Sequence, residues 1–194
     1  LKKLHIMRTK LLLLGMVMAA FAISCNKDEA TTPTSVTKED VAVTQKMDVA
    51  IDDVSVIADD QYEVREGTPS GRNGLSYTSM LPTCAVVSDL GSTASVRKLT
   101  ITFGTATEGC LFRGHSLRGK VILTRTITTN FPKTMTVTYD GFYVDGNKLE
   151  GEMLWTREMV GTGSTLHPKT TLTMTNVKLT TTAGAYVRNG HRTT

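Results

Sequence analysis

The chain has few of the residues that build metal centres, and they are widely separated. Its four histidines have no histidine or cysteine two or four positions away: His5, His115, His167 and His191. Zinc sites need closely spaced ligands, so we expect these histidines to lie in surface loops. The D-x-D-x-D-G spacing of calcium loops is also absent, and Asp140-Gly141 and Asp145-Gly146 indicate turns instead. The sequence predicts no metal and no cofactor.

Common catalytic motifs are missing as well. There is no G-x-S-x-G elbow and no Ser-His-Asp order, which argues against acyl transfer. Glu150 and Glu152 would lie on one face of a strand, with Cα atoms about 6.5–7 Å apart. Glycosidase carboxylates have comparable separations, but a pair on one strand needs a cleft that nothing in the sequence predicts. We interpret both as charges on a solvated sheet face and predict that the protein is not an enzyme.

The charge balance gives no argument for nucleic-acid binding. Four of the 22 basic residues lie before the cleavage site predicted below, which leaves 18 basic and 18 acidic residues. These charges are unevenly divided, because residues 25–66 hold 4 basic and 11 acidic side chains, whereas residues 67–194 hold 14 and 7. We expect the acidic segment to be attracted to the basic remainder.

An export signal dominates the first part of the chain. Arg8 and Lys10 precede the apolar run Leu11–Ile23, which is too short to span a membrane comfortably, and Ser24-Cys25 follows. The cysteine at the cleavage position resembles a bacterial lipobox, in which the signal is cut before the cysteine and the cysteine carries the lipid. The resemblance implies a signal peptide over residues 1–24 and a lipid anchor on Cys25.

The residues after Cys25 indicate where the anchored protein is displayed. Asn26-Lys27-Asp28-Glu29 resembles the acidic export tag of surface lipoproteins in the Bacteroidota. That resemblance implies an outer-membrane lipoprotein exposed at the cell surface. Residues 25–36 are rich in small and Thr residues, and we interpret them as a tether.

Two cysteines remain once Cys25 carries a lipid. Cys84 and Cys110 form an even pair in an oxidising compartment, which favours a disulfide between neighbouring strands. Such a bridge would stabilise the fold by roughly 3–4 kcal/mol in the chain-entropy model. The alternative is a pair of buried free thiols.

One helix is predicted, over residues 37–62. Thr37 is a suitable N-cap, and an acidic first turn follows it. Apolar residues then recur at steps of three and four, and they form one stripe: Val43, Met47, Ala50, Ile51, Val54, Ile57 and Ala58. A stripe of this kind needs a sheet to cover. Residues 66–79 are rich in turn formers and predict a loop.

From Leu81 onward the hydrophobic period changes to two. Apolar residues alternate with threonines in Leu99–Phe103, Thr134–Tyr139 and Thr171–Thr175, and Gly-containing turns separate the segments. The fold class predicted for residues 37–194 is therefore mainly β: an antiparallel meander, either a curved sheet or a sandwich, with one N-terminal amphipathic helix packed on it. The turn signal Asn189-Gly190 near the last residue indicates that the natural protein continues beyond Thr194.

Several stretches carry a wider family resemblance: Cys84, Leu99–Gly104, Cys110, Arg118–Val121 and Tyr143–Gly151. Together with the signal and helix, they make the chain resemble a group of uncharacterised surface lipoproteins of the Bacteroidota. The resemblance implies the same arrangement of lipobox, helix and antiparallel β domain, and it implies no activity.

Two features suggest ligand binding, each with a structural alternative. Arg113, His115, Arg118 and Lys120 form a basic cluster that suits an anionic glycan or phosphate, although a solvated hairpin explains it as well. Trp155 suits stacking on a sugar, but it shares a strand face with Leu149 and Met153, which favours the core.

The sequence therefore predicts a non-catalytic cell-surface lipoprotein with a binding or structural role. Its expected partners are the membrane, through the lipid on Cys25, and a glycan or protein ligand, with no nucleic acid. The alternative is a small surface glycan hydrolase. An exposed aromatic platform would favour glycan binding, and a deep pocket with convergent carboxylates would favour the hydrolase.

Overall fold

Residues 37–66 and 78–194 are described by the structure, a computed structural model, and Lys38–Thr194 form one compact unit. The predicted signal peptide, the tether and Cys25 lie outside the described residues, as does most of the loop predicted over residues 66–79.

The predicted helix is present as α2 (Lys38–Glu66), four residues longer at its C-terminal end than the sequence indicated. All seven residues of the apolar stripe are buried. Glu39 and Asp40 lie in the first turn and Arg65 in the last. Each charge is opposite in sign to the nearby end of the helix dipole and therefore stabilises the helix. Just before the extra turn, Tyr62 is buried with its ring centroid 4.7 Å from that of Trp155, and Glu63 within the turn pairs with Arg157 of β6.

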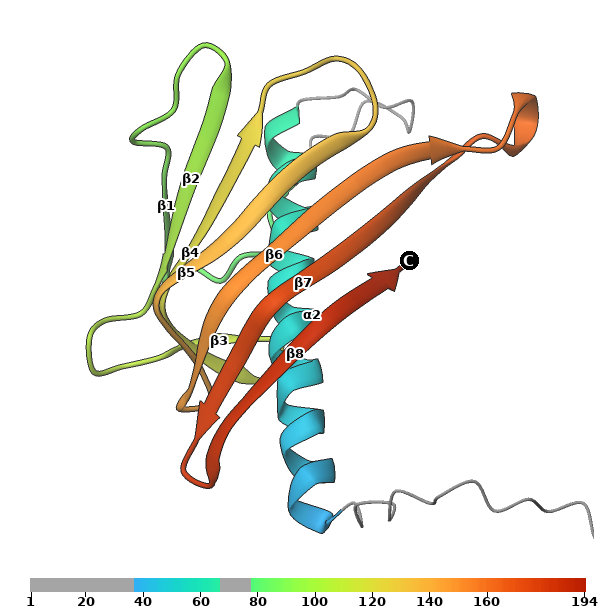
Figure 1. Cartoon of the computed structure of the whole chain (residues 1–194). Helices are drawn as coiled ribbons and strands as arrows, with labels where there is room; N and C mark the ends of the chain where they lie inside the picture. The colour runs from blue at the N-terminus through green and yellow to red at the C-terminus, as the bar shows by residue number, and fades with distance from the viewer. Residues whose placement is uncertain (1–36, 67–77) are drawn as a thin grey trace, which may run out of the picture. The chain divides into compact units, whose positions relative to one another are not determined.

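The predicted antiparallel architecture is present: eight strands of the described residues form one open sheet, which excludes the sandwich alternative (Figure 1). The strands are β1 (Ala85–Ser88), β2 (Val96–Phe103), β3 (Cys110–Phe112), β4 (His115–Thr126), β5 (Lys133–Val144), β6 (Asn147–Val160), β7 (His167–Thr181) and β8 (Gly184–Thr193), with the short 3-10 helix η2 (Gly163–Thr165) before β7. Neighbouring strands follow the order β1-β2-β4-β5-β6-β7-β8. The short strand β3 pairs with the first residues of β4, before the part of β4 that pairs with β2.

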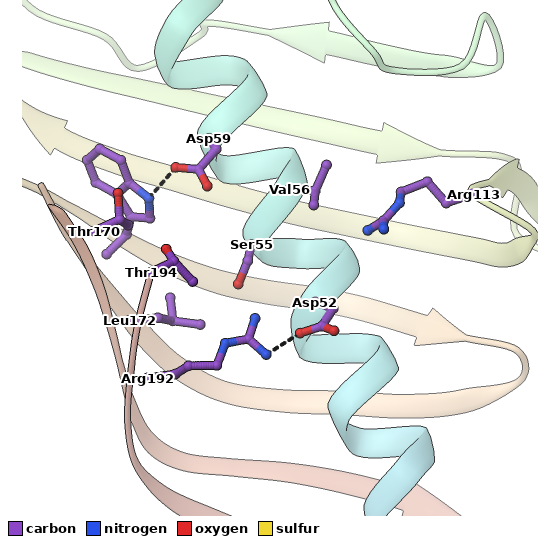
Figure 2. Close-up of a pocket in the computed structure, with 10 residues that line it drawn as sticks. Asp52, Ser55, Val56, Asp59, Arg113, Thr170, Leu172, Arg192 and Thr194 are labelled. Atoms are coloured by element: carbon purple, nitrogen blue, oxygen red, sulfur yellow. Dashed lines mark hydrogen bonds and ion pairs between the residues drawn. The ribbon is translucent and has the colours of Figure 1, made fainter. Parts of the chain in front are cut away.

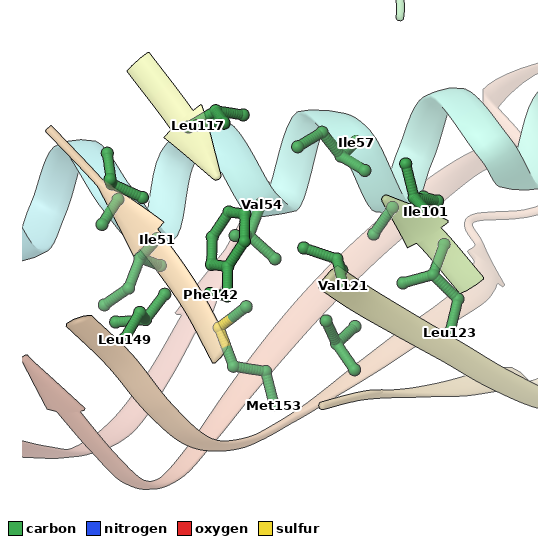
Figure 3. Packing of buried hydrophobic residues seen from close by; sticks show 14 of the residues in the cluster. Ile51, Val54, Ile57, Ile101, Leu117, Val121, Leu123, Phe142, Leu149 and Met153 are labelled. Carbon is green, nitrogen blue, oxygen red and sulfur yellow. The ribbon is translucent and has the colours of Figure 1, made fainter. Parts of the chain in front are cut away.

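The hydrophobic core lies between α2 and one face of the sheet, here called the inner face (Figure 3). Ile101, Val121 and Met153 come from three different strands and are fully buried together with Val54 of the helix. Trp155 is also buried, so its predicted place in the core is confirmed. The opposite, outer face carries the alternating threonines, because side chains of a strand point alternately to its two faces.

Two bulges break the strict alternation of the strands. In β5, Val137 faces inward, and so do Phe142 and Val144 after a register shift at the positive-φ Gly141. In β7, Met174 and Val177 are both buried, on either side of Asn176 at φ 49°. Each bulge inserts one residue, which reverses the inward parity of the rest of its strand.

Ion pairs join the helix to the sheet. Four arginines from β6, β8 and the β3–β4 turn bond acidic residues of α2: Arg113 with Asp53, Arg157 with Glu63, Arg188 with Asp48 and Arg192 with Asp52. The attraction predicted between the acidic segment and the basic remainder therefore takes the form of specific contacts along the helix.

The predicted disulfide is present, and Cys84 and Cys110 have Cα atoms 5.7 Å apart. It differs from the prediction in what it joins, because the two cysteines do not belong to neighbouring strands. Cys84 lies just before β1, which pairs with β2, whereas Cys110 begins β3, which pairs with β4. The bridge thus ties the two shortest strands of the sheet to each other.

Candidate functional site

The described domain has a groove on the outer face of the sheet, with a volume of about 420 Å³. We call it the outer groove. Its walls come from the end of β2, the loop that follows, and the facing bulge region of β4 and β5. It is lined by Thr102, Phe103, Gly104, Thr105, Ala106, Arg118, Gly119, Lys120, Asp140, Gly141 and Tyr143. This volume lies within the range usual for small-molecule sites.

Glycine residues shape the floor of the outer groove. A Cβ atom on Gly119, whose φ is 94°, would lie 1.9 Å from the carbonyl oxygen of Gly141. The backbones of β4 and β5 therefore approach each other at a distance that only glycine permits. A Cβ on Gly141 would meet nothing within 4 Å, so the adjacent bulge leaves open space.

Gly119→Ala is expected to destabilise the domain by about 2–4 kcal/mol, because it adds a backbone clash to an unfavourable positive φ. Gly141→Ala is the matched control, since it carries a positive φ without the clash and should cost about 1–2 kcal/mol. Urea unfolding measures both. Equal costs for the two variants would show that the close approach at Gly119 does not matter.

Two charged contacts line the outer groove. The Arg118 guanidinium lies 4.4 Å from the ring centroid of Tyr143, and its Nη1 donates to the carbonyl oxygen of Ala106 at 2.6 Å. Lys120 Nζ bonds Asp140 Oδ2 at 2.8 Å, and both side chains are exposed. The groove thus combines a stacked arginine with a lysine–carboxylate pair at the surface.

The predicted basic cluster is only partly brought together. Arg118 and Lys120 share the outer groove, but Arg113 bonds Asp53 of the helix at 3.3 Å. His115 Nδ1 lies 2.7 Å from Asp145 Oδ2. Burial alone would raise the pKa of Asp145, but hydrogen bonds from the Ser116 N–H and from His115 lower it. The four residues of the predicted cluster therefore bind different partners at three separate places: the helix, Asp145 and the outer groove.

Glu150 and Glu152 do not form a carboxylate pair over a cleft. Glu150 bonds Lys148 and Lys178, each at 2.8 Å, and these two bonds hold its pKa below the usual range. Glu152 lies on the exposed surface, beyond the register shift at Gly151. The structure thus supports the interpretation of both residues as charges on the sheet surface.

A second concavity lies beside α2, between the helix and the ends of β7 and β8 (Figure 2). We call it the helix cavity. Its volume is about 240 Å³. It is lined by Asp52, Ser55, Val56, Asp59, Arg113, Trp155, Thr170, Leu172, Arg192 and Thr194.

Both carboxylates of the helix cavity have protein partners (Figure 2). Asp52 pairs with Arg192, and Asp59 Oδ1 accepts a hydrogen bond of 2.7 Å from the indole Nε1 of Trp155. Burial raises the pKa of Asp59, and the bond from Trp155 and the charge of Arg157 oppose that rise without cancelling it. The same cause raises the pKa of Asp53, which is 2% exposed.

The free energy of unfolding of Asp59→Asn, relative to that of the parent protein, should be higher at pH 7 than at pH 3. A carboxyl group whose folded pKa is raised stabilises the fold fully below its unfolded pKa of about 3.9. That contribution is lost as pH rises through the folded pKa. Asparagine keeps an acceptor for the Trp155 indole and removes the titration.

Urea unfolding between pH 3 and 7 checks this prediction. Asp52→Asn is the control, because it removes a half-exposed carboxylate of the same cavity and should cost less than about 1 kcal/mol at pH 7. A stability difference between Asp59→Asn and the parent that does not change with pH would contradict the prediction.

Sequence reasoning did not assign several residues to either concavity. Asp140 and Gly141 were expected to form a turn, but they lie within β5 at its bulge, and strand register brings Tyr143 to the same groove. Ala106 reaches it from the loop after β2. Asp52 and Asp59 carried a weak signal, since both lie off the apolar stripe. Among residues 37–66 and 78–194, no group of three or more His, Cys, Asp or Glu could hold a metal ion. The expectation of loop histidines is wrong, because His115, His167 and His191 lie in β4, β7 and β8.

Comparisons with protein-family models, curated proteins and solved structures find no match to this chain. Within the described part of the chain, no helix is long and apolar enough to cross a membrane.

Proposed function

We propose that this protein is a non-catalytic lipoprotein, anchored to the outer membrane through Cys25 and exposed at the cell surface, whose β domain binds a glycan. The outer groove carries this proposal. It is an open concavity on the sheet with exposed charged and hydroxyl side chains, and of its lining residues only Phe103 belongs to the buried core of the described domain.

The groups in the outer groove match the chemistry of sugar hydroxyls, which both donate and accept hydrogen bonds. The Asp140 carboxylate is an acceptor, and the Lys120 ammonium is a donor held 2.8 Å from it. Thr102 and Thr105 add hydroxyl groups, and Tyr143 adds an aromatic side chain. A purely structural role would not require this combination of exposed groups around a glycine-lined floor.

The anchor rests on the sequence. The short apolar run, the small residues before Cys25 and the acidic residues after it support export and lipidation. Incorporation of labelled palmitate should be lost in Cys25→Ser and retained in the parent. Protease treatment of intact cells should digest the β domain. Labelling that persists in Cys25→Ser, or full protection of the domain, would contradict the anchor or the exposure respectively.

Glycan binding is tested with the purified lipoprotein in detergent and fluorescein-labelled polysaccharides, both neutral and acidic, by fluorescence anisotropy. At least one polysaccharide should bind, and Asp140→Ala should weaken it by roughly tenfold, since a charged hydrogen bond is lost. Lys169→Ala is the control, because Lys169 pairs with Glu158 away from the groove. Failure of every polysaccharide to bind would refute the proposal.

One observation favours the alternative of a small glycan hydrolase. In the helix cavity, Asp59 has the raised pKa that a general acid needs, and Asp52 is a second carboxylate. The two are seven residues apart on α2, which places their Cα atoms about 10.5 Å apart along the axis. Catalytic pairs have carboxyl groups about 5–9.5 Å apart, and both aspartates here are engaged by Trp155 and Arg192. We therefore favour binding.

Reducing-sugar release from the same polysaccharides separates the two functions. The binding proposal expects no release above that of buffer. Release that is abolished by Asp59→Asn, in a protein that remains folded, would establish the hydrolase instead.

A further inference from the structure

We infer that the outer groove selects glycans that carry carboxylate groups, with Arg118 as the residue that recognises the carboxylate. This inference rests on the proposed function and names its ligand class. It starts from an arginine that is held in place without an acidic partner.

Four other arginines of the domain bond carboxylates of the helix, and Arg118 does not. In the described part of the chain, the only hydrogen bond of its side chain is from Nη1 to the carbonyl oxygen of Ala106. A guanidinium group has five N–H donors, so most of those on Arg118 remain available to a ligand. A carboxylate is the partner that matches the planar fork of this group.

The position of Arg118 is set before any ligand binds. Its guanidinium lies against the ring of Tyr143, the residue directly opposite on β5, and it donates a hydrogen bond to the carbonyl oxygen of Ala106 in the loop after β2. Fixing a long side chain in advance reduces the entropy cost of binding. An arginine stacked in this way is therefore prepared to bind a carboxylate in two parallel hydrogen bonds.

A second cation extends the site. Lys120 lies two residues from Arg118 on the same face of β4, about 6.5–7 Å away at Cα. The lining of the groove thus holds two basic side chains and one carboxylate, that of Asp140. Its net charge is positive and suits an anionic ligand, while Asp140 remains able to accept hydrogen bonds from sugar hydroxyls.

The location of the groove favours a glycan over an acidic peptide. Extended peptides commonly bind by adding a strand to a free sheet edge. The groove lies over β2, β4 and β5, which are interior strands, and β4 pairs with both β2 and β5 at this level. None of these three strands is an edge strand, so we expect recognition by side chains and by the backbone of the β5 bulge, where residues 139–142 have no ladder partner in β6.

The test uses the purified lipoprotein in detergent with three carboxylated polysaccharides: polygalacturonate, alginate and hyaluronan. Polygalacturonate is also used as its methyl ester, which keeps the sugar backbone and removes the charge, and dextran serves as a neutral probe. At 0.15 M salt we expect binding to at least one acidic polysaccharide and none to dextran. Where polygalacturonate binds, its methyl ester should not.

Two substitutions then test Arg118 itself. Arg118→Gln should weaken binding by roughly tenfold or more, and Arg118→Lys, which keeps the charge but loses the fork, should fall between Gln and the parent. Arg188→Gln is the matched control, because it removes the same charge at the helix, where Arg188 bonds Asp48, and should change affinity by less than about twofold. Thermal melting confirms that each variant is folded.

The remaining outcomes are distinguishable. Binding of dextran or of the methyl ester as strongly as of the acid would overturn the selection for carboxylates and leave glycan binding in place. Equal weakening by Arg118→Gln and Arg188→Gln would overturn the role of Arg118. No binding to any acidic or neutral polysaccharide would overturn both proposals.

Discussion

Val54→Asp should destabilise the domain by about 3–5 kcal/mol, since it places an unpaired carboxylate in the core. Val54 is at the centre of the helix stripe and is 0% exposed (Figure 3). Its neighbours in the buried cluster include Phe142 and Met153, which have no group to pair with the charge. A loss of this size is a large part of the usual 5–15 kcal/mol of a domain.

Urea unfolding followed by tryptophan fluorescence measures the effect. Trp155 is the only tryptophan and contacts Tyr62 and Asp59 of α2, so it reports directly on helix docking. Val41→Asp is the matched control on the same helix, because Val41 is 48% exposed and should change stability by less than about 0.5 kcal/mol. Similar effects of the two variants would mean that α2 is not docked on the sheet.

Loss of the Cys84–Cys110 disulfide is expected to cost about 3–4 kcal/mol. The bridge closes a loop with a sequence separation of 26, and the chain-entropy model assigns this range to a loop of that length. It also holds β1 and β3, each of which pairs with a single strand. Without the bridge, we expect both strands to separate from the sheet before the rest unfolds.

The measurement compares the urea midpoint of the parent with that of the Cys84→Ala, Cys110→Ala double variant under non-reducing conditions. Thiol counting on the unfolded, unreduced protein should find neither cysteine free in the parent. Reduction with dithiothreitol should lower the parent to the level of the double variant and leave the double variant unchanged. A cost below about 1 kcal/mol would contradict the expected stabilisation.

Local patterns were sufficient to predict the helix and most strand faces. The stripe from Val43 to Ala58 has a period that only a helix can align, and all its members are buried. Likewise, Leu99, Ile101 and Phe103 alternate with exposed or half-buried residues in β2. Such signals are readable because they depend on the geometry of one element and on neighbours close in sequence.

The bulges were not predictable from the same alternation. Strict period two carries the inward face from Val137 to Tyr139 and then to Gly141, whereas Phe142 is the buried residue. A glycine signals a turn or a bulge equally well, and the choice depends on the partner strand. Here Gly141 forms a bulge and not a turn, because its backbone packs closely against Gly119 of the partner strand β4.

Asp53 and Asp60 show the same limit in the helix. Both lie off the apolar stripe, yet each is 2% exposed. Arg113 covers Asp53 from the β3–β4 turn, and Asp60 accepts hydrogen bonds from Ser79 and from the Met80 N–H. Helical periodicity identifies the face toward the sheet, but it does not reveal which distant segments cover the opposite face.

By itself, the sequence determined the elements of this protein: the amphipathic helix, the antiparallel strands, the pairing of Cys84 with Cys110 and the acidic character that draws α2 to the sheet. Only the tertiary structure decided which side chains meet. It separated Arg118 from Arg113, placed Arg118 on Tyr143 and opened a groove beside the bulge of β5. The reason is that element formation follows from short-range periodicity, whereas the groove depends on the register between strands, which the whole sheet and its bulges set together.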